Sequence, residues 1–329
     1  MLIEVNLKFM KKILLFDTSV CTDNLGDYLI VESIKIELRK FFPDDFFINI
    51  PTHDNVGKNS INKIKISDFK FVCGTNLLSS NMNSYSQWKI NIWYSRFITN
   101  VILIGVGWWQ YQNSPNFYTR ILLNRIMNKK YLHSVRDNYT VDKLKEIGIR
   151  NVINTGCPTL WNLNNKHCSL IPNKKSDNVL FTLTDYNKNC KRDLEFIKIL
   201  ESNYDRIYFW PQGLNDYEYL SAILKSCKNN IVYISPNIKG LDRLLSSEIE
   251  LDYIGTRLHA GIRALQYKRR TIIIGIDNRA VELARDFNLP VIKREEINCL
   301  SDRINSSFKT NIYLPTENIN NWRNQFIQE

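Results

Sequence analysis

The 329 residues are enough for two domains of ordinary size, and a composition of 44% hydrophobic and 23% charged residues is typical of a globular enzyme. The formal net charge of +11 favours anionic ligands, but the basic residues are dispersed and show neither zinc-finger spacing nor interleaved aromatic residues, which argues against nucleic-acid binding. No apolar run approaches the ~20 residues of a membrane span, so we expect a cytoplasmic protein with at most peripheral contact with the inner face of the membrane.

Cysteine and histidine spacing argues against disulfides and metal sites. The seven cysteines are scattered and form no C-x-x-C pair, which fits a reducing cytosol and disfavours both a disulfide framework and a structural zinc site. No H-E-x-x-H or comparable spacing occurs, so we expect no metal ion.

The first half of the chain alternates short apolar runs with longer amphipathic stretches. We predict strands at 13–16, 69–73, 101–105 and 133–135, and helices at 27–42, 120–130 and 140–147. The second and third of these strands are expected to end at Gly74 and Gly105. A looser stretch that contains Pro158 and Pro172 follows, and we place a domain boundary there.

The pattern then restarts. We predict strands at 178–183, 206–210, 231–234 and 271–276, a strand-like turn at 252–255, and helices at 191–202, 216–225, 257–266, 279–287 and 320–328. This alternation predicts an α/β protein of two Rossmann-like domains with parallel sheets, at 10–165 and 175–310, and a C-terminal helix within 311–329. Because such sheets bind ligands beyond the carboxyl ends of their strands, we expect the site in a cleft between the domains.

The first motif is the segment Asn24-Leu25-Gly26-Asp27, between the first predicted strand and the first predicted helix. Gly26 permits a tight turn, and a helix start offers free amide hydrogens and a partial positive charge to an anion. Asp27 can cap the helix, and capping alone would also explain the motif.

Two weaker motifs also follow predicted strands. Gly74 and Asn76 belong to Cys73-Gly74-Thr75-Asn76, whose backbone amides can approach an anion, although a plain strand-ending turn also explains them. Trp210 and Gln212 can contact a sugar, although the aromatic run around them is otherwise ordinary core.

Charged residues at strand ends form the stronger motifs. Arg136 follows the predicted strand 133–135, where its guanidinium can fork onto a carboxylate or phosphate; the alternative is a structural contact with Asp137. The strongest motif is Gly255-Thr256-Arg257-Leu258-His259, where Arg257 supplies a fixed charge and His259 can exchange a proton near neutral pH. A lone histidine is usually structural, but one that lies two residues from an arginine at a helix start is a better catalytic candidate.

A last motif, Asp277-Asn278-Arg279, begins the next predicted helix. Asp277 can simply cap that helix. Arg279 would add a further contact for an anion in the same layer of the fold as Arg257 and His259.

In their order and separation, these motifs resemble the polysaccharide pyruvyltransferase family. The resemblance runs from Asn24-Leu25-Gly26-Asp27 through Ser134-Val135-Arg136-Asp137 and Arg257-Leu258-His259 to the stretch 277–289. It implies that the two domains adopt a GT-B-like arrangement with the active site between them. It also implies that phosphoenolpyruvate is the donor and that the acceptor is a sugar of a cell-surface polysaccharide or of its lipid-linked precursor.

By the same resemblance, Arg136 and Arg257 hold the carboxylate and phosphate of the donor, and His259 is the general acid. The reaction protonates the methylene carbon, a sugar hydroxyl attacks the adjacent carbon, phosphate leaves, and a second hydroxyl closes a cyclic ketal. No cofactor is needed beyond the donor substrate. We therefore expect these three side chains to converge on one anion, while the diol is oriented by Asn76, Trp210 and Gln212.

Other functions stay open at the level of sequence. A GT-B glycosyltransferase that uses a nucleotide sugar would share the fold and a basic cleft, although we find no spaced pair of glutamates typical of retaining members. A non-catalytic glycan-binding or scaffold protein would keep Arg257 and His259 away from Arg136. Nucleic-acid binding would rest on net charge alone.

Overall fold

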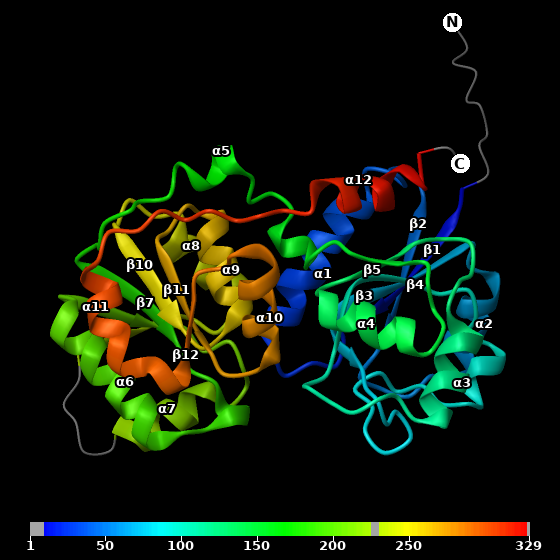
Figure 1. The fold of residues 1–329 in the computed structure, drawn as a ribbon, viewed down its shortest axis with the longest axis horizontal. Coiled ribbons are helices and arrows are strands. Elements are labelled where there is room, and N and C mark those ends of the chain that lie inside the picture. The colour runs from blue at the N-terminus through cyan, green and yellow to red at the C-terminus, as the bar shows by residue number, and fades with distance from the viewer. Residues whose placement is uncertain (1–9, 225–229, 328–329) are drawn as a thin grey trace, which may run out of the picture.

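The structure is a computed structural model that describes residues 10–224 and 230–327, and it consists of two α/β lobes side by side (Figure 1). The last residues of the predicted helices 216–225 and 320–328, the end of the segment 311–329, and Cys227 lie outside the described residues. Across the described residues, no helix combines the length and the apolar character that crossing a bilayer requires.

The first lobe is built on residues 12–154. Its elements are β1 (Lys12–Asp17), α1 (Leu25–Leu38), β2 (Phe46–Pro51), α2 (Lys58–Ile66), β3 (Phe69–Leu78), β4 (Ile102–Trp108), α3 (Phe117–Ile126), β5 (His133–Val135), α4 (Asn138–Glu146) and β6 (Val152–Asn154). The strands form one parallel sheet in the order β2-β1-β3-β4-β5-β6.

The second lobe follows the short helix α5 (Asn165–Cys168). Its elements are β7 (Asn178–Thr182), α6 (Cys190–Asn203), β8 (Arg206–Phe209), α7 (Asp216–Leu224), β9 (Ile231–Tyr233), α8 (Ile238–Leu245), β10 (Leu251–Gly255), α9 (Leu258–Gln266), β11 (Thr271–Gly275), α10 (Asn278–Phe287), β12 (Val291–Lys293) and α11 (Leu300–Asn305). The strands form a second parallel sheet in the order β12-β11-β10-β7-β8-β9. The predicted fold class, two Rossmann-like domains with parallel sheets, is therefore confirmed.

The central strands were predictable because they are buried on both faces. In β1, β3 and β4 nearly every residue is buried. Helices cover both sides of a parallel sheet, so its strands consist of continuous apolar runs rather than alternating patterns. The edge strand β2 is half-exposed and follows two aspartates, and the sequence analysis missed it.

The glycines Gly74 and Gly105 do not end their strands, and that prediction was wrong. β3 continues to Leu78 and β4 to Trp108. A Cβ atom on Gly74 would lie 2.5 Å from the carbonyl oxygen of Gly105, so the two glycines allow neighbouring strands to approach closely. The register shifts just beyond, between Thr75 and Leu78, where Thr75 has a φ of 138°. The stretch 252–255, which was predicted to be a strand-like turn, belongs to the central strand β10.

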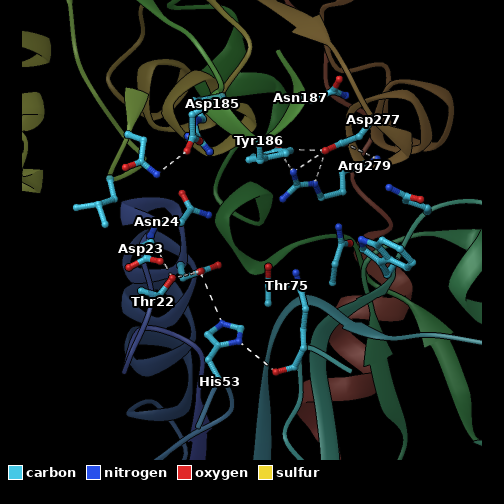
Figure 2. A pocket seen from close by; sticks show the side chains of 18 of the residues that line it. Thr22, Asp23, Asn24, His53, Thr75, Asp185, Tyr186, Asn187, Asp277 and Arg279 are labelled. Atoms are coloured by element: carbon cyan, nitrogen blue, oxygen red, sulfur yellow. Dashed lines mark hydrogen bonds and ion pairs between the residues drawn. The ribbon is translucent and has the colours of Figure 1, made fainter. Parts of the chain in front are cut away.

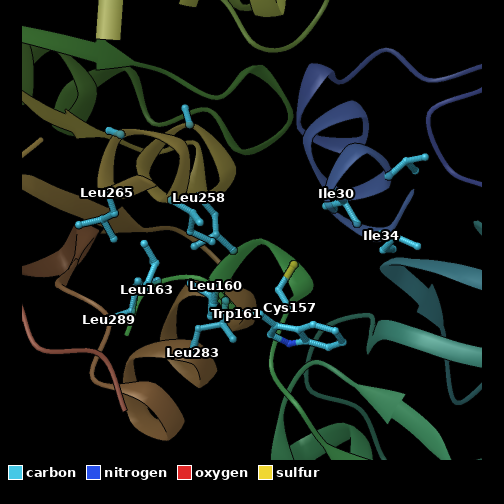
Figure 3. Close-up of a cluster of buried hydrophobic side chains, with 14 of the residues drawn as sticks. Ile30, Ile34, Cys157, Leu160, Trp161, Leu163, Leu258, Leu265, Leu283 and Leu289 are labelled. Atoms are coloured by element: carbon cyan, nitrogen blue, oxygen red, sulfur yellow. The ribbon is translucent and has the colours of Figure 1, made fainter. Parts of the chain in front are cut away.

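The lobes share one hydrophobic core. Figure 3 shows Ile30 and Ile34 of α1 near Cys157 and Leu160 of the connecting segment, with Leu258 of α9 beside them. These side chains belong to a single buried cluster that draws on both sheets. The lobes therefore pack against each other through apolar contacts as well as through the polar residues described below.

The C-terminal helix α12 (Thr316–Asn324) returns from the second lobe to pack on the first (Figure 1). Trp322 and Phe326 are buried against Phe71, with ring centroids 5.0–6.4 Å apart. Arg323 Nε donates to Glu37 Oε1 of α1 at 2.6 Å. The chain therefore crosses between the lobes twice.

Candidate active site

A cavity of about 740 Å³ lies between the lobes, at the carboxyl ends of both sheets. The first lobe supplies residues at or beyond the ends of β1, β2, β3 and β4, and the second lobe supplies residues beyond β7, β8, β10 and β11. Figure 2 shows Thr22, His53 and Thr75 on one side and Asp185, Tyr186 and Arg279 on the other. Open α/β sheets bind ligands at this position.

The start of α1 joins the two lobes. Asn24 caps the helix, since its Oδ1 accepts from the backbone N–H of Gly26 at 3.1 Å. The same oxygen accepts from Nε2 of Gln212 at 2.7 Å, and Oε1 of Gln212 accepts from the backbone N–H of Ala260 in α9 at 3.2 Å. A Cβ atom on Gly26 would lie 2.7 Å from Nε2 of Gln212, so a larger residue there would displace this amide from its contact with Asn24.

Arg257 immediately precedes α9, at the N-cap position, and lines the cavity. Its guanidinium donates to both carboxylate oxygens of Asp216, with Nε at 2.9 Å from Oδ2, and to Asp185 Oδ1 at 2.9 Å. The ring of Tyr186 lies over it, 5.1 Å from the guanidinium carbon. Arg257 is thus fixed in position, and its charge is shared with two carboxylates.

Arg279 lies across the cavity from α1 and is paired with the residue that caps α10. Asp277 accepts from the backbone N–H of Arg279 at 3.0 Å and from its Nη2 at 2.5 Å. Arg279 also donates to the hydroxyl of Tyr186. Burial raises the pKa of Tyr186 to about 12, so this phenol stays protonated near neutral pH.

Arg136 is buried behind the cavity and is not one of its lining residues. It is 1% exposed, and its Nε donates to Asp137 Oδ2 at 3.1 Å. Within the described part of the chain, its two terminal nitrogens have no hydrogen-bond partner. Gly107 makes room for them, because a Cβ atom there would lie 2.3 Å from the guanidinium carbon.

His259, in the first turn of α9, is 4% exposed and also does not line the cavity. Its Nε2 lies 3.8 Å from the sulfur of Cys157. Burial, reinforced by the charges of Arg279 and Arg136, lowers the pKa of His259 from 6.5 to about 3. The imidazole is therefore neutral at pH 7 when no ligand is bound, and it lies within electrostatic reach of both arginines.

Comparison with known proteins places this arrangement in a family. The family model for polysaccharide pyruvyl transferase matches residues 24–278, which is most of the chain. The chain belongs to the polysaccharide pyruvyl transferase family. None of the curated protein sequences with which it was compared is significantly similar to it.

Solved structures show the GT-B arrangement of this pyruvyl transferase family member. The UDP-GlcNAc 2-epimerase of Methanocaldococcus jannaschii, in complex with UDP-GlcNAc and UDP, is similar with a TM-score of 0.57 and 16% identity over 96% of this chain and 98% of that one. A second structure of the epimerase from the same organism gives a TM-score of 0.50 and 16% identity over 93% and 95% of the two chains. At such identities the likeness establishes the fold alone.

The structure distributes the predicted residues of the pyruvyl transferase site over three places. The cavity is lined by Asn24, Asp27, Asn76, Arg257, Asp277 and Arg279. Directly behind it, and buried, are Arg136 and His259. The remaining residues have structural positions. Gly26 and Gln212 lie at the contact between the lobes, and Gly74 lies inside the first sheet. Trp210 is fully buried, and its indole N–H donates to the carbonyls of Ser235 and Asn237.

Other lining residues were missed by the sequence analysis. His53 follows β2, the strand that was not predicted, so no strand end marked it. Asp185 and Tyr186 come directly after β7, which was predicted, and the strand-end rule applied there would have identified them. The carboxylate of Asp185 and the phenol of Tyr186 matter because they hold the cavity-lining Arg257 and Arg279 in position.

Proposed function

We propose that the protein transfers the pyruvyl group of phosphoenolpyruvate to two hydroxyls of a sugar and releases phosphate, leaving a pyruvate ketal on a cell-surface polysaccharide or its lipid-linked precursor. Membership of the polysaccharide pyruvyl transferase family supports this type of reaction. The structural observation that carries the proposal is Arg136, a buried guanidinium whose two terminal nitrogens lack a partner.

A buried cation with free N–H groups favours an anionic ligand. Each unmet buried donor costs about 1–3 kcal/mol, and more when the group is charged. A carboxylate or phosphate accepts two N–H groups of one guanidinium at once and so removes this penalty. Arg257 and Arg279 already have carboxylate partners that balance their charge, so the unpaired donors come from Arg136.

The donor must approach Arg136 and His259 from the cavity side. Neither residue lines the cavity, but the charge of Arg136 acts on Asp277, which does, and on His259. Direct contact with a ligand therefore requires a local movement of the residues that separate these two side chains from the cavity.

His259 acquires its proton together with the donor in this proposal. Burial, and after it the charges of Arg279 and Arg136, lower its pKa in the empty protein, and a bound trianion would offset the effect of the two arginines and favour the charged imidazole. The charged imidazole then donates its proton to the methylene carbon of phosphoenolpyruvate. The adjacent carbon becomes oxocarbenium-like and open to attack by a hydroxyl, and the carbon–oxygen bond to phosphate breaks afterwards.

Calorimetry with phosphoenolpyruvate in buffers of different ionisation enthalpy tests this proposal. We expect wild type to take up a proton on binding, and His259→Gln to lose this uptake together with about 10²–10⁴-fold of its acceptor-dependent phosphate release. His167→Gln is the matched control, because among the described residues the hydrogen bond of His167 Nε2 goes to the backbone carbonyl of Leu265, away from the cavity residues. Binding of a nucleotide sugar without binding of phosphoenolpyruvate would instead support a glycosyltransferase, and near-normal turnover of His259→Gln would refute the acid role.

A further inference from the structure

A second pair of titratable side chains faces the cavity from the first lobe. Asp27 lies in the first turn of α1. His53, which Figure 2 shows, follows β2. Nε2 of His53 lies 3.9 Å from Oδ2 of Asp27. Neither side chain has a part in the donor chemistry described above.

Asp27 carries an oxygen that lacks a donor. Its Oδ2 accepts from the hydroxyl of Thr22 at 2.6 Å, but its Oδ1 has no hydrogen-bond partner within the described residues, and the side chain is only 6% exposed. A buried carboxylate oxygen that lines a cavity and is left without a donor is satisfied when a ligand brings one. A hydroxyl group is such a donor.

Asn76 repeats this arrangement nearby. It also lines the cavity from the first lobe, and its Oδ1 is buried without a partner in the described chain. Two unpaired acceptors on one wall match a ligand with two hydroxyls. Pyruvate ketal formation requires such a diol.

His53 is oriented to pass a proton on. Its Nδ1 lies 3.3 Å from the carbonyl oxygen of Gln87, and because a carbonyl only accepts, Nδ1 carries the hydrogen. Nε2, on the other side of the ring, faces Asp27 and can exchange a proton with it. Burial raises the pKa of Asp27 above its usual value, while the Thr22 hydroxyl, His53, Arg279 across the cavity and the Thr75 hydroxyl each lower it in part.

We propose that Asp27, backed by His53, is the catalytic base that takes the proton of the attacking sugar hydroxyl, and that Asn76 binds the second hydroxyl. This inference rests on the proposed pyruvyl transfer. The hydroxyl oxygen forms a bond to the central carbon of the donor while its proton moves to Asp27 Oδ1. Of the two hydroxyl protons released in forming the ketal, one replaces the proton that His259 gave to the methylene carbon, and the other leaves with the phosphate as hydrogen phosphate.

The assignment divides the cavity between the two substrates. The donor lies toward Arg136, His259 and the second-lobe turn that carries Asp277, and the acceptor sugar lies against α1, β2 and β3 of the first lobe. Acceptor chemistry should then depend on first-lobe residues that leave donor binding unaffected. This separation makes the inference testable independently of the function.

The test compares Asp27→Asn and His53→Gln with wild type, with Asp54→Asn as the control because Asp54 is exposed next to His53. Affinity for phosphoenolpyruvate is measured by calorimetry, and phosphate release is measured with a panel of methyl hexopyranosides as acceptors. We expect both variants to bind phosphoenolpyruvate within about threefold of wild type. Asp27→Asn should lose about 10²–10⁴-fold in kcat with little change in acceptor KM, since asparagine still accepts a hydrogen bond.

The pH dependence provides a second readout. The acidic limb of kcat, which reports a base, should disappear in Asp27→Asn and shift in His53→Gln, whereas a purely structural role would lower kcat equally at all pH values. Wild-type turnover in Asp27→Asn overturns the inference and leaves the proposed function intact, as does a loss of phosphoenolpyruvate binding in that variant alongside normal thermal unfolding. If wild type releases no phosphate with any of the sugars, the proposed function fails and the inference fails with it.

Discussion

Arg136 is held in a position that stability alone does not explain. It is fully buried, and among the residues that the structure describes its one carboxylate partner is Asp137, its neighbour in the chain, which also caps α4 through Thr140. Breaking a charged pair or leaving a charge unpaired in the interior is destabilising, so a buried guanidinium with free donors is a strained arrangement unless a ligand completes it.

Arg136→Met should therefore separate stability from binding. Methionine removes the two unpaired donors, which stabilises the protein, but it also leaves the buried Asp137 carboxylate with its bonds to Thr140 and without its cation, which destabilises it. Because these effects oppose each other, we expect little net change in the melting temperature. Affinity for phosphoenolpyruvate should fall at least about 30-fold, the effect of losing one partner of a buried charge pair. Scanning calorimetry and binding calorimetry on the same samples measure both effects, and a less stable variant with unchanged affinity would contradict the assignment.

The buried histidines make the stability of the protein sensitive to acid. Burial lowers the pKa of His133 to about 4, and burial together with Arg279 and Arg136 lowers the pKa of His259 to about 3, both from 6.5. Between these values and 6.5 the unfolded chain binds more protons than the folded protein. Stability must therefore fall as the pH is lowered through this window.

His259→Gln should reduce this sensitivity. Between pH 7 and pH 5, wild type should lose about 2 kcal/mol of unfolding free energy because folding keeps His259 neutral. This figure covers the roughly 1.5 pH units from 6.5 down to 5, at about 1.4 kcal/mol for each unit. Urea unfolding at the two pH values should show a loss smaller by that amount in the variant. The dependence that remains includes the contribution of His133, and an identical loss in both proteins would show that His259 is not buried in neutral form.

At the scale of the elements, Gly74 and Gly105 allow β3 and β4 to extend as far as the cavity. Gly105 has a φ of +65°, and a Cβ atom there would lie 2.3 Å from Cδ of Pro158, at the start of the segment that connects the lobes. With Gly74 opposite, it lets the two strands continue beyond the point where the glycines predicted an end. Thr75 and Asn76 reach the cavity for this reason.

Gly105→Ala should be strongly destabilising. Backbone strain at positive φ and the clash with Pro158 together predict a loss of about 2–4 kcal/mol in unfolding free energy. Gly57→Ala is the control, since Gly57 has a φ of −81° and no atom within 4 Å of the added carbon, and it should change stability by less than about 0.5 kcal/mol. Equal effects of the two substitutions in denaturant titrations would rule out this account.

At the scale of the whole molecule, the shared core and α12 make the two lobes one structural unit. One buried cluster runs from the first sheet through the connecting segment to α9 and α10, and α12 adds Trp322 and Phe326 to it. The cavity lies at the edge of this shared core. Its geometry therefore depends on contacts that neither lobe makes alone.

Trp322 allows this dependence to be measured. Trp322→Ala should cost about 3–5 kcal/mol, because it removes a large fully buried side chain. Trp322→Phe should cost only about 1–2 kcal/mol, because the buried indole N–H has no partner among the described residues and its loss breaks no hydrogen bond. Trp93→Ala, at an exposed tryptophan, is the control; if it were as damaging as Trp322→Ala in urea unfolding, the packing role of α12 would be wrong.

The sequence by itself determined the two parallel sheets, the residues at strand ends and the family. Apolar runs, amphipathic stretches and the positions of Arg136, Arg257 and Asp277 after strands are local features, and a parallel sheet brings all strand ends to one edge. This reasoning failed in two places. The strand before His53 is half-exposed, so its apolar pattern is weak, and the glycine at position 74 suits both a strand end and a close approach of two strands.

Only the tertiary structure decided which of these side chains are free and which already have partners. Asp185 and Asp216 hold Arg257, Asp137 leaves Arg136 half-satisfied, and the packing of α9 buries His259 as a neutral imidazole. Burial and hydrogen bonding depend on segments that are far apart in the chain. Charge state and partner therefore cannot be derived from spacing, whereas strand and helix periodicity can.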